Sequence, residues 1–213
     1  MTARDLSFAH VFRPAARPGP PPVLLLHGTG GDETDLLPLG EAVAPGAALL
    51  SPRGQVLERG APRFFRRLAE GVFDEDDVRR RAGDLARFIA EARETYGIGA
   101  PVALGYSNGA NIAAAVLLLH PESLAGAALL RPMAVLSDPP QANLRGKPVL
   151  MLSGAADPIA GPDSVAALEV ALTASGAEVT REILLASHGL TRDDLAAATA
   201  WFARRAADAP SSS

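Results

Sequence analysis

Short apolar runs alternate along this chain with longer segments in which apolar residues recur every three or four positions. The run Val23-Leu24-Leu25-Leu26 holds no polar residue, which is typical of a strand buried on both faces of a parallel sheet. Similar runs predict further strands, at 6–12, 47–50, 101–104, 125–130, 148–152 and 179–185. The first of these is expected at an edge of the sheet.

Helical periodicity fills the segments between these strands. Helices are predicted at 36–43, 110–119 and 162–174, together with a long helix capped by Asp74 and a final one capped by Thr191. Strands that alternate with helices predict an α/β fold, with a mostly parallel sheet and helices on both faces. We expect one domain over 1–206 without a large cap domain, followed by a tail at 207–213.

Composition excludes several classes of protein. The chain has no cysteine, which rules out disulfides, Cys-based zinc sites and a cysteine nucleophile. A net charge of −4 without a long basic stretch argues against binding to nucleic acid or to an anionic membrane surface. No apolar run reaches membrane-spanning length, and the first residues lack the apolar core of a signal peptide. We expect a cytoplasmic protein without stable membrane insertion; edge strands and exposed helices allow a homodimer, but no sequence feature demands one.

The segment Gly105-Tyr106-Ser107-Asn108-Gly109 lies between a predicted strand and a predicted helix. A serine between two glycines at such a turn is typical of a nucleophile elbow, in which the glycines permit a sharp, strained turn. The turn exposes the serine hydroxyl at the end of the sheet. Ser107 is therefore the candidate nucleophile.

A serine nucleophile needs a base to take its proton and an acid to orient that base. The chain has four histidines, and only His188 lies in a loop directly after a predicted strand beside glycine, away from the glycine-rich turn at His27. Asp157, in a small-residue loop at the end of another strand, is the expected acid. Asp163 has the position of a helix N-cap instead, and Asp138 lies in the preceding loop.

An oxyanion that forms during attack on a carbonyl needs fixed hydrogen-bond donors. The backbone N–H of Asn108, which begins a helix, is expected to be one of them. The second should come from the glycine-rich turn after Leu26, with Thr29 as the first choice and Gly30 as the alternative. The order Ser107, Asp157, His188 along the chain is that of α/β-hydrolases, not of chymotrypsin or subtilisin.

Four segments together resemble the α/β-hydrolase superfamily, and within it the phospholipase/carboxylesterase family. They are Leu26–Asp32, Gly105–Ala110, Asp157–Ile159 and Ser187–Leu190. The resemblance implies an α/β-hydrolase fold and a Ser-His-Asp esterase with no metal and no organic cofactor. It also implies Thr29 and Asn108 as the oxyanion donors. Many members carry glutamine after the serine where this chain has Asn108, so no acyl-chain preference transfers.

The segment 53–72 has no clear period and is expected to be irregular and to border the substrate pocket. Phe64, Phe65 and Phe73 could line an acyl groove or pack beneath this segment as a separate apolar cluster. Arg53, together with Arg66 and Arg67, could bind an anionic leaving group or form a solvated surface.

These observations predict a carboxylesterase that acts on small to medium acyl esters. A thioesterase or a lysophospholipase would use the same residues, and a non-catalytic ligand-binding member of the fold is the alternative of another class.

Overall fold

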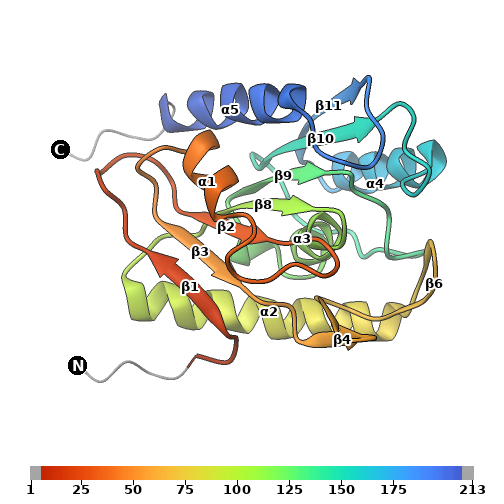
Figure 1. Cartoon of the computed structure of the whole chain (residues 1–213), viewed down its shortest axis with the longest axis horizontal. Coiled ribbons are helices and arrows are strands. Elements are labelled where there is room, and N and C mark those ends of the chain that lie inside the picture. The colour runs from red at the N-terminus through yellow and green to blue at the C-terminus, as the bar shows by residue number, and fades with distance from the viewer. Residues whose placement is uncertain (1–5, 208–213) are drawn as a thin grey trace.

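The computed structural model describes residues 6–207 and is built on a seven-stranded sheet in the order β1-β3-β2-β8-β9-β10-β11 (Figure 1). The strands are β1 (His10–Arg13), β2 (Val23–Leu26), β3 (Leu49–Pro52), β8 (Val102–Tyr106), β9 (Gly126–Leu130), β10 (Pro148–Gly154) and β11 (Glu178–Leu184). Within this sheet, only the pair β1–β3 is antiparallel. The predicted mostly parallel sheet and its seven strands are confirmed.

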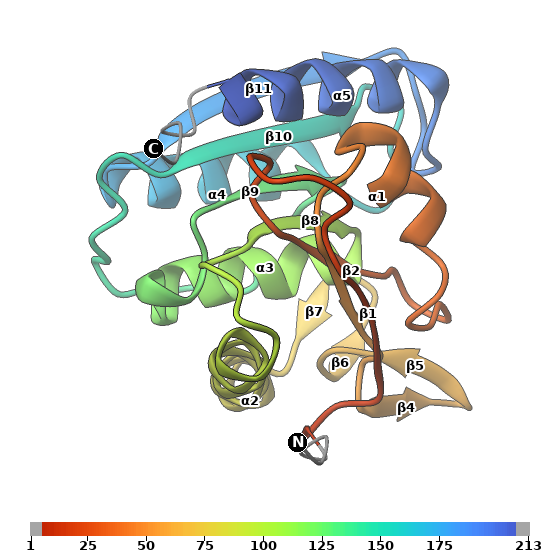
Figure 2. The same ribbon diagram turned by 90° about the vertical axis from the view of Figure 1, so that its left-hand side faces the viewer.

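Helices cover both faces of the sheet, as predicted (Figure 2). One face carries α1 (Leu37–Val43) and α5 (Arg192–Ala207), and the other carries α2 (Glu75–Tyr96), α3 (Asn108–Leu119) and α4 (Pro162–Ala174). A short 3-10 helix, η1 (Pro121–Ser123), follows α3. No helix within residues 6–207 is long and apolar enough to cross a membrane.

The strand β2 shows why a continuous apolar run is needed at the centre of this fold. Successive side chains of a strand point to opposite faces. Leu24 and Leu26 accordingly pack in the core beneath α2, α3 and α4, whereas Val23 and Leu25 pack in the core beneath α1 and α5. All four residues are fully buried.

The ends of the long helix α2 follow the sequence closely. The Asp74 side chain accepts a hydrogen bond from the backbone N–H of Asp77, and Gly97 ends the helix in the left-handed conformation, with φ of 65°. The apolar residues that recur at helical spacing along α2 face the core: Val78, Leu85, Phe88, Ile89 and Ala92 are buried, and Tyr96 is partly buried. The prediction for α4 is wrong in one detail: Gly161 occupies the N-cap and Asp163 lies in the first turn.

The segment 53–72 is not irregular, which corrects the sequence-based expectation. It forms two small hairpins, β4 (Val56–Glu58) with β5 (Ala61–Arg63), and β6 (Arg67–Ala69) with β7 (Val72–Phe73). Arg59 and Gly60, with φ of 51° and 87°, form the first two-residue turn, and positive φ at both positions matches the twist of a tight hairpin. Strands of two or three residues are too short to show an alternating pattern.

The final helix α5 runs to Ala207, one residue beyond the expected domain limit, and the remainder of the expected tail, 208–213, lies outside the described residues. The loops that follow β2, β8, β10 and β11 all leave the carboxyl ends of parallel strands. Ligands bind beyond these ends in open α/β sheets. The fold therefore places the four loops that carry the predicted site at one edge.

Candidate active site

Ser107 lies at a strained turn between β8 and α3, with φ of 52°. Glycine is required on both sides, because a Cβ at Gly105 would overlap the backbone of Gly109, and a Cβ at Gly109 would overlap the carbonyl of Leu26. The N–H of Ser107 donates to the carbonyl oxygen of Leu130 at 2.8 Å. Close packing against two neighbouring strands thus holds a conformation that a serine rarely adopts.

His188 connects Ser107 to Asp157. Its Nε2 lies 2.9 Å from Ser107 Oγ, and its Nδ1 lies 3.0 and 2.9 Å from the two carboxylate oxygens of Asp157. An ionised carboxylate only accepts hydrogen bonds, so Nδ1 carries the proton and Nε2 is left to accept one from the serine hydroxyl. The Asp157 side chain is 1% exposed and the His188 side chain 17% exposed. The structure thus brings together the three residues selected from the sequence.

The carboxylate of Asp157 is held in its charged form. Burial alone would raise its pKa, but backbone N–H groups of Ala160 and Ile159, at 3.0 and 2.8 Å from Oδ1, and the contact with His188 outweigh burial. The pKa of Asp157 therefore lies below its ordinary value of 3.8. The charge that orients His188 is present throughout the neutral range.

Two of the other histidines, His10 and His27, have different partners. His10 contacts the hydroxyl of Tyr96 and the carbonyl of Phe8. His27 is buried, accepts a hydrogen bond from the N–H of Gly54 and donates to the carbonyl of Gly28. Burial lowers the pKa of His27, which is consistent with a neutral residue that braces the glycine-rich loop.

Thr29 and Asn108 both line the same cavity as Ser107. The backbone N–H of Asn108 belongs to the first turn of α3 and has no acceptor within that helix, while its Oδ1 accepts the N–H of Phe64 at 2.7 Å. The Thr29 hydroxyl accepts a hydrogen bond from Nη1 of Arg63 at 2.8 Å. The N–H of Gly30, the alternative donor, is already bonded to the carbonyl of Pro62 at 2.9 Å.

Ser107 opens into a cavity of about 270 Å³. The cavity is lined by Thr29, Arg63, Arg67, Glu70, Phe73, Tyr106, Ser107, Asn108, Asn111, Met133, Ile159 and His188. Its volume is at the low end for small-molecule sites, and its walls are both apolar and charged. Residues 6–207 contain no group of three or more side chains that could hold a metal ion.

Comparison with known proteins identifies the family. Residues 21–145 match the model of the alpha/beta hydrolase fold. The chain belongs to the α/β-hydrolase family. The predicted fold class, with a mostly parallel sheet, helices on both faces and no large cap in the described residues, is thereby confirmed.

Relatives of this α/β-hydrolase include carboxylesterases. It is 44% identical to the "Putative hydrolase MhqD" of Bacillus subtilis (strain 168) over 182 residues, which cover 84% of this chain and 91% of that protein. Its structure matches the Bacillus cereus carboxylesterase with a TM-score of 0.91 and 44% identity, over 94% and 96% of the two chains. The Mesorhizobium loti carboxylesterase matches with a TM-score of 0.88 and 37% identity, over the same shares. The protein is thus a carboxylesterase-like α/β-hydrolase.

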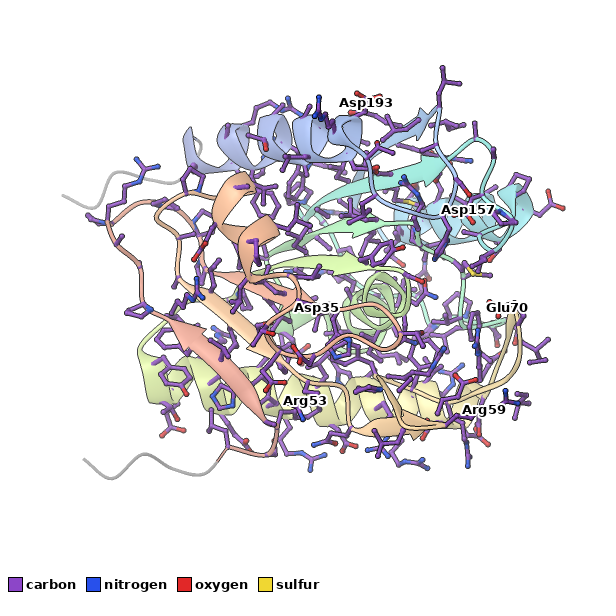
Figure 3. The ribbon with its side chains drawn as sticks, viewed as in Figure 1. Asp35, Arg53, Arg59, Glu70, Asp157 and Asp193 are labelled. Carbon is purple, nitrogen blue, oxygen red and sulfur yellow. The ribbon has the colours of Figure 1, made fainter. Side chains whose placement is uncertain are left out.

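Three of the four predicted substrate-binding residues of this hydrolase do not line the cavity. Phe64 and Phe65 are 3% and 0% exposed; they neither line a groove nor form a separate cluster, but belong to the main core beside α2 and α3. Arg53 forms an ion pair with Glu33 and lies away from Asp157 and Glu70 (Figure 3). Only Phe73 lines the cavity, and its ring contacts that of Phe65 edge to face.

The structure adds pocket residues that sequence reasoning did not select. Arg63, Tyr106, Asn111, Met133 and Ile159 line the cavity from separate segments of the chain. Three of them are close in sequence to selected residues: Arg63 precedes Phe64, Tyr106 lies within the elbow and Ile159 lies in the Asp157 loop. No spacing pattern in the sequence connects Met133 or Asn111 with the site.

A buried ion pair supports the His188 loop from behind. Arg131 is fully buried, has a φ of 57° and binds both carboxylate oxygens of Asp194, at 2.7 and 2.8 Å. The same guanidinium donates to the carbonyls of Ser187 and Gly189, the residues on either side of His188. Arg131 thus ties the loop to the ends of β9 and α5.

Proposed function

We propose that this α/β-hydrolase is a carboxylesterase that cleaves small to medium acyl esters through Ser107, His188 and Asp157. The observation that carries the proposal is the continuous chain of hydrogen bonds from Ser107 Oγ through both nitrogens of His188 to the buried carboxylate of Asp157. Two relatives with 37% and 44% identity that are themselves named carboxylesterases support it.

The mechanism follows from the positions of these atoms. His188 Nε2 takes the hydroxyl proton as Ser107 Oγ attacks the ester carbonyl, and Asp157 stabilises the resulting imidazolium. The N–H groups of Thr29 and Asn108 bind the oxyanion. His188 then passes the proton to the leaving alkoxide, the acyl group remains on Ser107, and water enters to repeat the cycle. No metal or organic cofactor is required by this sequence of steps.

Ester hydrolysis is favoured over binding without catalysis because Ser107, His188 and Asp157 lie within hydrogen-bonding distance of one another. A ligand-binding member of the fold would have no need for a charged acid, a correctly protonated base and a cavity-lining serine, each bonded to the next. Thioesters and lysophospholipids would use the same residues, and the small cavity disfavours the latter.

The size of the cavity predicts a preference for short acyl chains. We expect kcat/KM for p-nitrophenyl esters to be highest for acetate to hexanoate and to fall by about tenfold or more by palmitate, because a cavity of about 270 Å³ cannot enclose a long chain. The rate of p-nitrophenolate release gives kcat/KM for each ester of the series. A maximum at dodecanoate or beyond would contradict the size argument while leaving the esterase activity itself intact.

The protonation states predict a single ionisation on the acid side of the pH profile. His188 must be neutral to act as the base, so kcat/KM should fall by about tenfold per pH unit once this residue is protonated. Since the pKa of Asp157 is lowered, this carboxylate stays charged above pH 4 and adds no second step. Initial rates with p-nitrophenyl acetate between pH 4.5 and 8 test this; a flat profile would contradict a histidine base.

The proposal also covers location and partners. We place the protein in the cytoplasm, with which the absence of cysteine is compatible, and assign it a small-molecule ester as its partner. The edge strands allow a homodimer, and sedimentation analysis of the purified protein would test this prediction.

A further inference from the structure

The cavity has a charged wall that the reaction itself does not use. Arg63, Arg67 and Glu70 line it together with the reacting residues. They come from the two hairpins β4–β5 and β6–β7, and Figure 3 shows Glu70 at the same end of the molecule as Asp157.

The guanidinium of Arg63 is fixed in place. The residue is 3% exposed, and its Nε donates to the carbonyl of Phe65 at 3.2 Å. Its Nη1 donates to the hydroxyl of Thr29 at 2.8 Å and lies 3.1 Å from a carboxylate oxygen of Glu58. A buried cation with this many partners forms a rigid part of the pocket beside a proposed oxyanion donor.

Arg67 shares the same carboxylate. Its Nε lies 3.0 and 3.1 Å from the two oxygens of Glu58, and its Nη1 donates to Glu70 at 2.5 Å. Among the described residues, Nη2 of Arg67 makes no hydrogen bond. The Nη2 group of a positioned guanidinium, with its two N–H donors, is therefore left for a ligand.

The charges on this wall are unevenly distributed. The guanidinium groups of Arg63 and Arg67 share the partly buried carboxylate of Glu58. The second carboxylate of the wall, that of Glu70, is 59% exposed, so solvent screens its charge. Burial and the neighbouring charge of Arg67 lower the pKa of Arg63. The wall would be stabilised by one further negative charge on the cavity side.

A plain alkyl chain does not suit such a wall, because it would remove water from charged groups without replacing their hydrogen bonds. We propose that Arg67, supported by Arg63, binds a carboxylate carried by the substrate, so that the preferred substrates are small esters with a free carboxylate group. This inference rests on the proposed esterase function. A planar guanidinium matches a carboxylate in geometry, and one negative charge balances the excess better than the two of a phosphate monoester.

The carboxylate can lie on either the acyl or the alcohol side of the ester, and paired substrates distinguish the two. The acyl pair is the p-nitrophenyl half ester of glutaric acid and the corresponding ester of glutaramic acid. The alcohol pair is 4-acetoxybenzoate and 4-acetoxybenzamide. Each pair differs only by exchange of a carboxylate for a primary amide of nearly the same shape.

We expect kcat/KM to favour the carboxylate by about tenfold or more in one of the two pairs, the size of one charge-assisted hydrogen bond. In Arg67→Gln this ratio should fall to about one, and in Arg67→Lys, which keeps the charge but not the planar group, it should be intermediate. Addition of 0.5 M NaCl should reduce the wild-type ratio.

Arg87→Gln is the matched control. Arg87 is an exposed arginine of α2 that pairs with Asp84 and does not line the cavity. Its replacement should leave the ratio in both pairs unchanged. Melting temperatures of all variants establish that any loss belongs to the site and not to unfolding.

The possible failures are distinguishable. If the amide esters are hydrolysed in a Ser107-dependent reaction but neither carboxylate is favoured, the carboxylate site is wrong and the esterase stands. A wild-type preference that survives in Arg67→Gln also overturns the assignment to this residue. If none of the four esters is hydrolysed and a fluorophosphonate does not label Ser107 of the wild type, the proposed function fails and the carboxylate site with it.

Discussion

Replacement of Ser107 by alanine is expected to lower kcat for ester hydrolysis by at least about 10⁴-fold. The proposed mechanism has no second nucleophile, and loss of a serine nucleophile in comparable enzymes removes nearly all catalysis beyond that of binding and the oxyanion donors. Alanine keeps the Cβ that already occupies the strained turn at φ of 52°, so the fold should not change. The measurement is hydrolysis of p-nitrophenyl acetate by purified wild type and variant at matched melting temperature.

Ser175→Ala provides the matched control for this result. Ser175 is a buried serine at the end of α4, and it does not line the cavity. Its replacement should leave kcat within about twofold of wild type. Hydrolysis that persists in Ser107→Ala would show that the elbow serine is not the nucleophile.

Labelling by a fluorophosphonate resolves the case in which no ester is cleaved. This reagent reacts with an activated serine, so the wild type should gain the mass of one phosphonyl group on Ser107, and Ser107→Ala should gain none. Labelling without turnover would indicate a narrow substrate range. An unlabelled wild type would favour a ligand-binding protein instead.

The sequence predicted those parts of the site whose geometry depends on local backbone conformation. The elbow is one example, because the overlap that a Cβ would cause at Gly105 and Gly109 makes glycine necessary at these spacings. Loops at the carboxyl ends of strands are another, since parallel topology alone brings Asp157 and His188 to the same edge. The apolar run Val23–Leu26 likewise predicted a strand that is buried on both faces of the sheet.

The parts that could not be predicted depend on contacts between distant segments. Phe64 and Phe65 have the composition of a substrate groove, but only the folded hairpins determine that they point into the core. Arg131 follows an apolar strand and precedes proline, which in the sequence indicates an exposed turn. Its partner Asp194 is separated from it by 63 residues, and no periodicity relates the two positions.

Replacement of Arg131 by methionine is expected to destabilise the protein by about 3–5 kcal/mol. Removal of one member of a buried ion pair leaves the other as an uncompensated buried charge, and here Asp194 is 2% exposed. For a chain of this size the loss corresponds to a fall in melting temperature on the order of 10 °C. Arg87→Met, which breaks an exposed pair with Asp84, should cost less than about 1 kcal/mol.

The same replacement should also impair hydrolysis well below the melting temperature. The carbonyls of Ser187 and Gly189 would lose their donors at 2.9 and 3.1 Å, which frees the loop that holds His188 near Ser107. We expect kcat to fall by about tenfold or more with little change in KM, because the base and not the substrate pocket is displaced. A reduced stability with unchanged kcat would mean that Arg131 stabilises the fold without positioning His188.

A double variant separates the charge from the contacts. Arg131→Met combined with Asp194→Leu removes both charges, so the double variant should be more stable than the sum of the two single losses predicts, by about 2 kcal/mol or more. Stability should not return fully, because Asp194 also accepts hydrogen bonds from the N–H and hydroxyl of Thr191 at 2.8 and 2.9 Å. Since the double variant still lacks the donors to Ser187 and Gly189, its kcat should remain low even as stability recovers. Recovery of both together would show that the loss of activity in Arg131→Met came from instability alone, and denaturant unfolding with parallel rate measurements decides between the two.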